Sequence, residues 1–378
     1  MQLFCVKPKI DYYETFADFA KDFCIRSTDL LLTEKLIYDL FAKDLQLPCH
    51  VLLRDDYDMG EPKEEFIDQM LKDLRSVKID RIIAVGGGSV IDTAKVMSVR
   101  NAYPVANLMK GKTPVIIEKE LVVIPSTCGT GSEVTFGGIV TMKENGLKTA
   151  IMDEKMSSSH AVLIPEVIKG LPLKVFTHCS IDALGHSMES YVSATRGNEF
   201  SRAMGGQAVS MILDGYADMI VNGPDYRQNI LKKFIQASCM GGMAVNNGGA
   251  GPVHALAYPL GEVCHMSHGE SIYQFLTAVF EFYQKSLQGD PVFERLVEII
   301  SVPLKKAGLF TSHEEVFTRM EIMMNKVYPS RPLHEAGMKE SDIEPFADSI
   351  MKNKQRLIVA SPVSFTKDDA IMIYRKRF

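Results

Sequence analysis

The sequence predicts an α/β domain over residues 1–172 and an all-helical domain over residues 173–378. Two patterns support this division. Short β-like runs alternate with helical patterns over the first 170 or so residues, which is typical of a parallel sheet flanked by helices. From about Lys174 onward, long helical patterns follow one another without a convincing strand. Gly170 and Pro172 interrupt the chain between the two parts, so we expect the boundary there.

Length, charge and cysteine usage limit the class of protein. The chain has 378 residues, more than one ordinary core accommodates, and its composition is globular, with 46% hydrophobic and 24% charged residues. A formal net charge of -5 without a basic block argues against a nucleic-acid partner. No apolar run approaches the roughly 18 residues that span a bilayer, and the N-terminus does not resemble a secretory signal. Seven cysteines at wide spacings, without CxxC, predict free thiols in a reducing cytoplasm.

Each expected strand of the first domain is a short apolar run, often rich in β-branched residues. We expect strands at residues 29–33, 49–55, 81–85 and 120–127, and a hairpin or edge pair at 138–143 and 148–153. Helices are expected over residues 63–77, where the first turn is acidic, and over 89–99.

The expected helices of the second domain show apolar residues at helical spacing. They cover residues 175–194, 203–221, 230–245, 271–287, 291–308, 314–327, 340–353 and 366–378.

Three consecutive glycines, Gly86, Gly87 and Gly88, directly follow the strand at 81–85. Glycine allows the backbone to approach a ligand closely, and the helix that follows directs free N–H groups at the turn, which suits a pyrophosphate. Ser89 is the expected N-cap of this helix, with Asp92 completing a capping box. The turn is not GxGxxG, and a tight turn without a ligand is the alternative interpretation.

A second polar glycine loop, STCGTGSEVT, follows the strand at 120–127. Its hydroxyls belong to Ser126, Thr127, Thr130 and Ser132. Because ligands of open α/β sheets bind at the carboxyl ends of strands, the two glycine loops are expected to form two walls of one cleft.

Glu34 follows the strand at 29–33. An acid in this position can accept hydrogen bonds from the adenosine ribose and would repel a 2′-phosphate, which favours NAD over NADP. From the pattern alone, a solvated acid at a helix start is the simpler interpretation.

One carboxylate and three imidazoles suit a site for a divalent metal of the Zn²⁺ or Fe²⁺ type. Asp182 and His186 are four residues apart, so on a helix they share one face. His254 and His268 lie where glycines and a proline interrupt an apolar stretch. For any single histidine, an ordinary hydrogen-bonded imidazole is the simpler interpretation.

Spacing leaves other metal sets open. His178 precedes Asp182 by four residues on the same expected face, and His265 precedes His268 by three. A catalytic metal should keep one coordination position open for the substrate. A phosphate-binding turn and a Lewis-acidic metal in one chain predict hydride transfer between a nicotinamide cofactor and an alcohol or aldehyde.

Four segments together resemble the iron-containing (group III) alcohol dehydrogenases: GGGSVIDTAK, STCGTGSEVT, IDALGHSMESYVS and GPVHALAYPLG…SHG. They occur in the family's order over nearly the whole chain. The resemblance implies an NAD-binding α/β domain, an all-helical metal- and substrate-binding domain, and a metal in the cleft between them. It also implies a homo-oligomer, a dimer or larger, and a small alcohol or aldehyde as substrate.

The resemblance also assigns site residues. The metal positions fall on Asp182, His186, His254 and His268, which leaves His178 and His265 as non-ligands. The cofactor positions fall on Gly86, Gly87, Gly88, Ser89, Asp92, Thr127, Thr130, Ser132 and Lys148. The family's strand-end acid, usually Asp, is similar in placement to Glu34. The name of the family favours Fe²⁺ as the metal, although a set of one carboxylate and three imidazoles binds Zn²⁺ more tightly.

One position departs from the family pattern. Most members carry a second histidine four residues after the first His of the HAxxH motif, and this chain has Tyr258 there. A proton relay through that histidine is therefore excluded, and Tyr258 becomes the candidate for orienting substrate or shuttling the hydroxyl proton. Packing against the nicotinamide ring is its alternative role.

Within the family, HALAYPLG and the segment from Arg331 to Leu357 resemble the 4-hydroxybutyrate dehydrogenases, which interconvert 4-hydroxybutyrate and succinate semialdehyde with NAD. The alternatives are a family dehydrogenase for a diol, a simple alcohol or lactaldehyde, and, in another class, a dehydroquinate synthase-like lyase. A substrate carboxylate needs a cation, and Arg356 is the candidate because arginine can bind a carboxylate bidentately. A surface cation at a helix C-terminus is the alternative role of Arg356.

Overall fold

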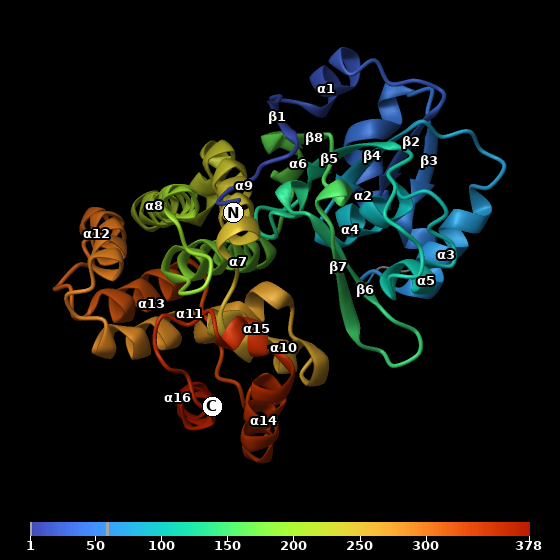
Figure 1. Cartoon of the computed structure of the whole chain (residues 1–378). Helices are drawn as coiled ribbons and strands as arrows, with labels where there is room; N and C mark the ends of the chain where they lie inside the picture. Colours follow the sequence, from blue (N-terminus) through green and yellow to red (C-terminus); the bar gives the residue numbers. More distant parts are fainter. Residues whose placement is uncertain (1, 58–59) are drawn as a thin grey trace. The chain divides into compact units, whose positions relative to one another are not determined.

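The computed structural model describes residues 2–57 and 60–378, which form two compact units (Figure 1). One unit is Val6–Gly170, and the other is Leu171–Phe378 together with the residues up to Cys5. The first contains a parallel sheet with helices and the second is helical, which confirms the predicted fold class. The predicted domain limits, 1–172 and 173–378, stay a prediction.

The α/β unit is built on a six-stranded sheet in which every neighbouring pair of strands is parallel. Its spatial order is β1 (Lys9–Tyr12), β8 (His160–Leu163), β5 (Glu120–Pro125), β4 (Arg81–Gly86), β2 (Asp29–Thr33) and β3 (His50–Leu53). The sequence pattern did not predict β1 and β8. Each has only four residues, too few to show a period, and together they form one end of the sheet.

Helices and one hairpin complete this unit. The α-helices are α1 (Phe16–Asp22), α2 (Lys35–Ile37), α3 (Glu64–Asp73), α4 (Gly88–Met97), α5 (Val105–Met109) and α6 (Pro165–Ile168). The predicted hairpin is present as β6 (Gly137–Thr141) and β7 (Lys148–Met152), which pair antiparallel as a separate two-stranded sheet (Figure 1). Aromatic residues of α1 pack against buried aliphatic residues of the main sheet and form one hydrophobic core.

Ten α-helices make up the described part of the helical unit, and no strand occurs there. They are α7 (Leu173–Val192), α8 (Glu199–Asn222), α9 (Leu231–Gly248), α10 (Pro252–Val263), α11 (His268–Ser286), α12 (Pro291–Lys306), α13 (Val316–Val327), α14 (Ile343–Asn353), α15 (Gln355–Ile358) and α16 (Lys367–Arg377). From Phe176 to its end, α7 is almost wholly buried, with α8, α9 and α11 packed against it (Figure 1). Among the described residues, no helix is long and apolar enough to cross a membrane.

The chain's first residues belong to the helical unit because side-chain hydrogen bonds hold them there. The N–H of Cys5 donates to Asn247 Oδ1 at 2.7 Å, and Asn247 Nδ2 donates to the carbonyl of Cys5 at 3.1 Å. The helical unit therefore consists of two segments of the chain, before and after the α/β unit.

Candidate functional site

Helix α7 presents Asp182 and His186 on one face, one turn apart, as their spacing predicts. Both side chains are buried. Gly185 lies between them, and a Cβ there would come within 2.8 Å of Ile272 Cγ2 on α11. Glycine is therefore required at this point for α11 to pack closely against α7.

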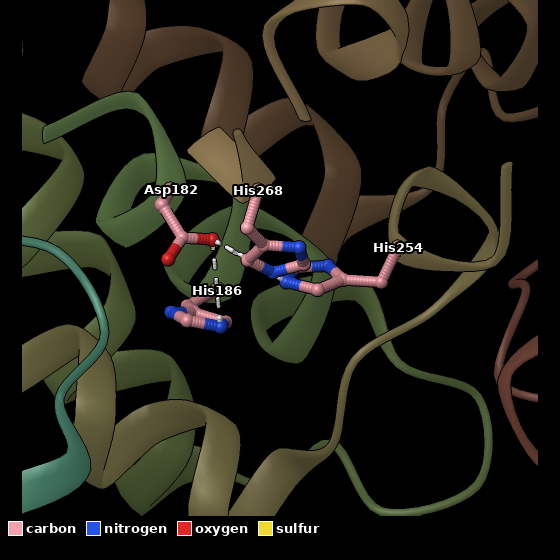
Figure 2. Close-up of side chains that lie close together, drawn as sticks. All are labelled: Asp182, His186, His254 and His268. Atoms are coloured by element: carbon pink, nitrogen blue, oxygen red, sulfur yellow. Dashed lines mark ion pairs between the residues drawn. The ribbon is translucent and has the colours of Figure 1, made fainter. Parts of the chain in front are cut away.

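The starts of two further helices bring the other histidines to this face. His254 is the third residue of α10, and His268 is the first residue of α11. A Cβ on Gly269 would lie 2.1 Å from the carbonyl oxygen of His178, so only glycine lets α11 begin this close to α7. As a result, the side chains of Asp182, His186, His254 and His268 point toward one another, as Figure 2 shows.

The geometry of these four side chains fits a bound divalent cation. Asp182 Oδ1 lies 3.4 Å from His268 Nε2, 3.7 Å from His254 Nε2 and 3.8 Å from His186 Nε2 (Figure 2). Four ligand atoms at about 2.0–2.2 Å from one metal in a tetrahedral arrangement lie roughly 3.3–3.6 Å apart. Asp182 Oδ1 and His254 Nε2 are buried, and neither has a hydrogen-bond partner in the described part of the chain. A buried polar atom without a partner is costly, and a metal ion would satisfy both.

The group is open on one side. The side chain of His268 is 45% exposed, whereas the other three side chains are buried. Solvent and small molecules can therefore approach the group where His268 lies. This is the arrangement that a catalytic metal with an exchangeable coordination position requires.

Burial and neighbouring charges shift the pKa values of this group in different directions. Burial alone would raise the pKa of Asp182, but the imidazoles of His186 and His268 outweigh it and hold that pKa well below its ordinary value. Burial lowers the pKa of His186 to about 4. For His254, burial acts in the same direction, but the carboxylates of Glu189 and Asp182 prevail and raise its pKa to about 9. The two carboxylates thus favour a positive charge on His254, whereas burial keeps His186 neutral at pH 7.

A second buried carboxylate, Glu189, supports the group and was not singled out from the sequence. Its Oε1 accepts the Val253 N–H at 2.6 Å, and its Oε2 contacts His254 Nδ1 closely. This contact leaves Nε2 of His254 directed at the other members of the group of four residues, which is called the metal group below: Asp182, His186, His254 and His268. The signal was present in the sequence: Glu189 lies three residues after His186 and seven after Asp182, on the same face of α7.

The structure separates the metal group from the two histidines that spacing had left open. His178 is buried beside the rings of Tyr273 and Tyr328, and burial lowers its pKa to about 4. His265 is exposed, with a backbone φ of 53° in the turn before α11. Neither belongs to the group of four.

In the α/β unit, the predicted cofactor residues gather at the carboxyl ends of three neighbouring strands. Glu34 follows β2, the three glycines end β4 and begin α4, and Ser126 follows β5. The two glycine loops touch, because the N–H of Ser126 donates to the carbonyl of Gly86 at 2.9 Å. A Cβ on Gly88 would lie 3.0 Å from Thr130 Cγ2, and one on Gly87 would lie 3.6 Å from Thr127 Cγ2. The expectation that these loops lie together is correct.

The predicted capping of the following helix is wrong. Gly87 is the N-cap of α4, Gly88 is already helical, and no side chain caps this end. Asp92 instead accepts hydrogen bonds from Ser132 Oγ at 2.5 Å and from the Ile139 N–H at 3.0 Å. The glycines let the helix begin earlier than Ser89, and the carboxylate of Asp92 binds Ser132 of the second loop and Ile139 of β6 instead.

The buried Lys95 also holds this loop in place, and the sequence pattern did not identify it. Its Nζ donates to Ser132 Oγ, Thr135 Oγ1 and the carbonyl of Gly137 at 2.8–3.2 Å. Burial lowers the pKa of Lys95, which the nearby charge of Asp92 opposes. Asp92 and Lys95 therefore attach the second loop to α4, three residues apart on that helix.

Other predicted residues have structural partners of their own. Glu34 is partly buried, 3.7 Å from Arg54 Nη1, and burial raises its pKa. It is therefore more than a solvated helix-start acid. Lys148, on β7, pairs with Glu61 Oε1 at 2.5 Å. Tyr258 is partly buried beneath the ammonium of Lys354, and Arg356 is exposed on α15.

Comparison with known proteins places these features in a family context. Residues 13–165 match the family model for iron-containing alcohol dehydrogenases, and residues 176–378 match the C-terminal model of the Fe-containing alcohol dehydrogenase family. The 4-hydroxybutyrate dehydrogenase of Clostridium kluyveri is 37% identical over 380 residues, covering 100% of both chains.

Solved structures share the fold. A 1,3-propanediol oxidoreductase superposes with a TM-score of 0.82 at 21% identity, covering 100% of both chains. A sulfoacetaldehyde reductase from Bifidobacterium kashiwanohense, in complex with NAD+, also gives a TM-score of 0.82, at 17% identity over 100% of this chain and 99% of the other.

Proposed function

Because the chain belongs to the iron-containing alcohol dehydrogenase family, we propose that it transfers hydride between NAD(H) and a primary alcohol or aldehyde. The proposed substrate pair is 4-hydroxybutyrate and succinate semialdehyde. The observation that carries the proposal is the group formed by Asp182, His186, His254 and His268, open beside His268. These residues are proposed to hold one divalent metal ion, which polarises the substrate oxygen when bound.

The α/β unit supplies residues suited to NAD. The first turn of α4 presents backbone N–H groups and the positive end of the helix dipole at the glycine loops, which favours a pyrophosphate there. Thr127, Thr130 and Ser132 supply hydroxyls, Ser132 with Asp92 holding the second loop in place. Glu34 is proposed to accept the ribose hydroxyls and to disfavour a 2′-phosphate. The bound nicotinamide would exchange the hydride with the substrate.

The substrate assignment rests on two observations. The 4-hydroxybutyrate dehydrogenase of Clostridium kluyveri matches over the full length of this chain. The chain also carries Tyr258 one helical turn after His254 on α10, where we propose that it orients the substrate or shuttles its hydroxyl proton. A diol, a simple alcohol or lactaldehyde is the alternative substrate on the same machinery.

A substrate panel tests the proposal. Purified protein, loaded with Fe²⁺ or Zn²⁺ without air, is assayed by NADH absorbance with 4-hydroxybutyrate, 1-butanol, 1,3-propanediol and lactaldehyde. We expect the highest kcat/KM with 4-hydroxybutyrate, and activity with NAD well above that with NADP. A preference for 1-butanol or a diol would contradict the substrate assignment, and metal analysis of anaerobically purified protein decides between iron and zinc.

The same assay tests a second reaction class. A dehydroquinate synthase-like lyase uses NAD and regenerates it within one catalytic cycle. Net accumulation of free NADH, in proportion to the alcohol consumed, therefore excludes that class. We further propose a homo-oligomer in the reducing cytoplasm, in accord with seven free cysteines, and light scattering of the metal-loaded protein tests the assembly.

A further inference from the structure

A lysine ammonium lies over the ring of Tyr258, one helical turn after His254 on α10. Lys354 Nζ is 3.6 Å from the centroid of the Tyr258 ring, a short cation–π contact. Tyr258 follows His254 by four residues, so the two side chains share a face of α10. Helical side chains lean toward the N-terminus, which directs the Tyr258 ring back toward the turn of His254.

The backbone of Lys354 is held firmly at a junction of two helices. Its N–H donates to the carbonyl of Ile350 at 2.9 Å, at the C-terminal end of α14. Its carbonyl accepts hydrogen bonds from the N–H groups of Leu357 and Ile358, at 2.8 and 3.1 Å, at the N-terminal end of α15. Both helices pack against α10, so the position of the Lys354 backbone follows from the fold rather than from a flexible loop.

Arg356, the candidate from the sequence, is placed less suitably. It is exposed on α15, and its charge acts on Arg196, whose pKa is lowered by burial and by that charge. Arg196 itself donates to the carbonyl of Asn246 at 2.9 Å. Lys354, by contrast, is only partly exposed and contacts a residue of α10 directly.

We propose that Lys354 binds the carboxylate of an ω-hydroxy acid or ω-oxo acid substrate, with the Tyr258 ring holding the ammonium in place. The inference rests on the proposed function. Four residues of α-helix rise about 6 Å, which separates the turn of Tyr258 from that of His254. In an extended four-carbon hydroxy acid with bonds of about 1.5 Å, the hydroxyl oxygen lies roughly 5 Å from the carboxylate carbon. The substrate is therefore about as long as the rise from the turn of His254 to that of Tyr258, over whose ring the ammonium of Lys354 lies, and an ammonium–carboxylate pair is a strong, charge-assisted contact.

Selectivity between a charged and an uncharged substrate tests this proposal. The variants are Lys354→Met, which keeps an apolar stem, Lys354→Arg, which keeps the charge, and Arg356→Met. Lys352→Met, an exposed lysine in the last turn of α14, is the matched control. The measured quantity is kcat/KM for 4-hydroxybutyrate divided by kcat/KM for 1-butanol. We expect Lys354→Met to lower this ratio about 10- to 100-fold, because a carboxylate loses its charged partner.

We expect Lys354→Arg to keep most of the ratio, and Lys352→Met and Arg356→Met to change it less than about threefold. An unchanged ratio in Lys354→Met, or a loss confined to Arg356→Met, overturns the proposal. An equal loss on both substrates also overturns it, since it indicates a structural role.

A binding measurement separates this inference from the proposed function. Butyrate, an unreactive carboxylate, is titrated into the metal-loaded wild type with NADH bound, and into Lys354→Met under the same conditions. Weaker butyrate binding in the variant supports the carboxylate role of Lys354 even if 4-hydroxybutyrate proves not to be the substrate. If the wild type oxidises 4-hydroxybutyrate but both proteins bind butyrate equally, the inference fails and the proposed function stands.

Discussion

One buried side chain, Glu189, connects the metal group to the start of α10. It is a carboxylate with two hydrogen-bonded neighbours on α10, the N–H of Val253 and the imidazole of His254. Carboxylates that accept from a ligating histidine fix its ring and its tautomer, which strengthens metal binding. Glu189 is therefore a positioning residue, since it acts on a proposed metal through His254.

We expect Glu189→Gln to weaken metal binding about 10- to 100-fold while leaving the fold intact. Glutamine offers one acceptor oxygen, so it cannot serve both the N–H of Val253 and the Nδ1–H of His254. Competition with a chelating dye measures the affinity for Zn²⁺ directly, and circular dichroism checks the helices. Glu262→Gln, which changes an exposed acid on α10, the helix that carries His254, should leave the affinity unchanged. Equal affinities in all three proteins would show that Glu189 has no such role.

Spacing alone predicted half of the metal group. Asp182 and His186 follow from one helical face, because their relation is local. His254 and His268 come from two other helix starts, and their approach depends on contacts that Gly185 and Gly269 make possible. No local pattern encodes such contacts, so only the family resemblance could complete the set.

At the scale of elements, the junction of β4 and α4 sets the shape of the nucleotide loops. The second glycine loop packs so closely on α4 that a Cβ on Gly88 would lie 3.0 Å from Thr130 Cγ2 and 3.2 Å from its Oγ1. We expect Gly88→Ala to displace Thr130 and to weaken NADH binding about tenfold, with a stability loss of about 1–2 kcal/mol.

Fluorescence titration of NADH and thermal unfolding check this expectation. Gly170→Ala is the control, because no atom lies within 4 Å of a Cβ there and its φ is ordinary. NADH affinity in Gly88→Ala equal to that of the control would mean that the loop does not contact the cofactor.

An ion-pair network joins three helices of the helical unit and predicts a pH dependence. Asp214 of α8 pairs with Lys233 of α9 and Lys306 of α12, both at 2.5 Å. Burial would raise the pKa of Asp214, but hydrogen bonds from the two lysines prevail and lower it. A lowered carboxyl pKa stabilises the fold fully above the ordinary value of about 3.9 and ceases to do so as pH falls through the folded value.

We therefore expect Asp214→Asn to lower stability by about 0.5–1 kcal/mol at pH 7, since the network is partly exposed. The difference from the wild type should begin to shrink as pH falls below about 4, where the unfolded carboxyl takes up a proton, and should vanish only below the lowered pKa of the folded state. Thermal unfolding at pH 7 and pH 3.5 measures both values, with the exposed Asp225→Asn as control. A difference that is the same at both pH values would contradict the electrostatic explanation.

The long helices were predictable, whereas the two strands at one end of the main sheet were not. The long helices of the second unit carry two or more turns of apolar periodicity, and each except α10 and the short α15 lies in a range expected from the sequence. The four-residue strands β1 and β8 were missed because the sheet, not their own pattern, makes them strands. The start of α4 was misplaced because three glycines carry no side-chain signal for a cap.

At the scale of the whole molecule, the two proposed binding sites belong to different units. The metal group lies within Leu171–Phe378, whereas the nucleotide loops lie within Val6–Gly170. Each site is built from the hydrogen bonds and packing of its own unit. Metal and cofactor binding are therefore expected to be separable.

We expect a chelator to remove the metal and abolish turnover while NADH affinity falls less than about threefold. The second glycine loop, proposed to bind NADH, is held by Asp92 and Lys95, which do not depend on the metal group. Fluorescence titration before and after chelation, followed by readdition of Fe²⁺ or Zn²⁺, measures both effects. Parallel loss of NADH binding and activity would show that the metal maintains the fold rather than the chemistry.

The hydrogen bonds between Cys5 and Asn247 imply an order in which parts of this chain fold during synthesis. Cys5 leaves the ribosome 242 residues before Asn247, so it must wait for that much more chain before its partner exists. The α/β unit lies entirely between them and can fold in the meantime, since domains generally fold as units during synthesis. The segment around Cys5 then docks late, and closing that loop is a step that occurs only once α9 has formed.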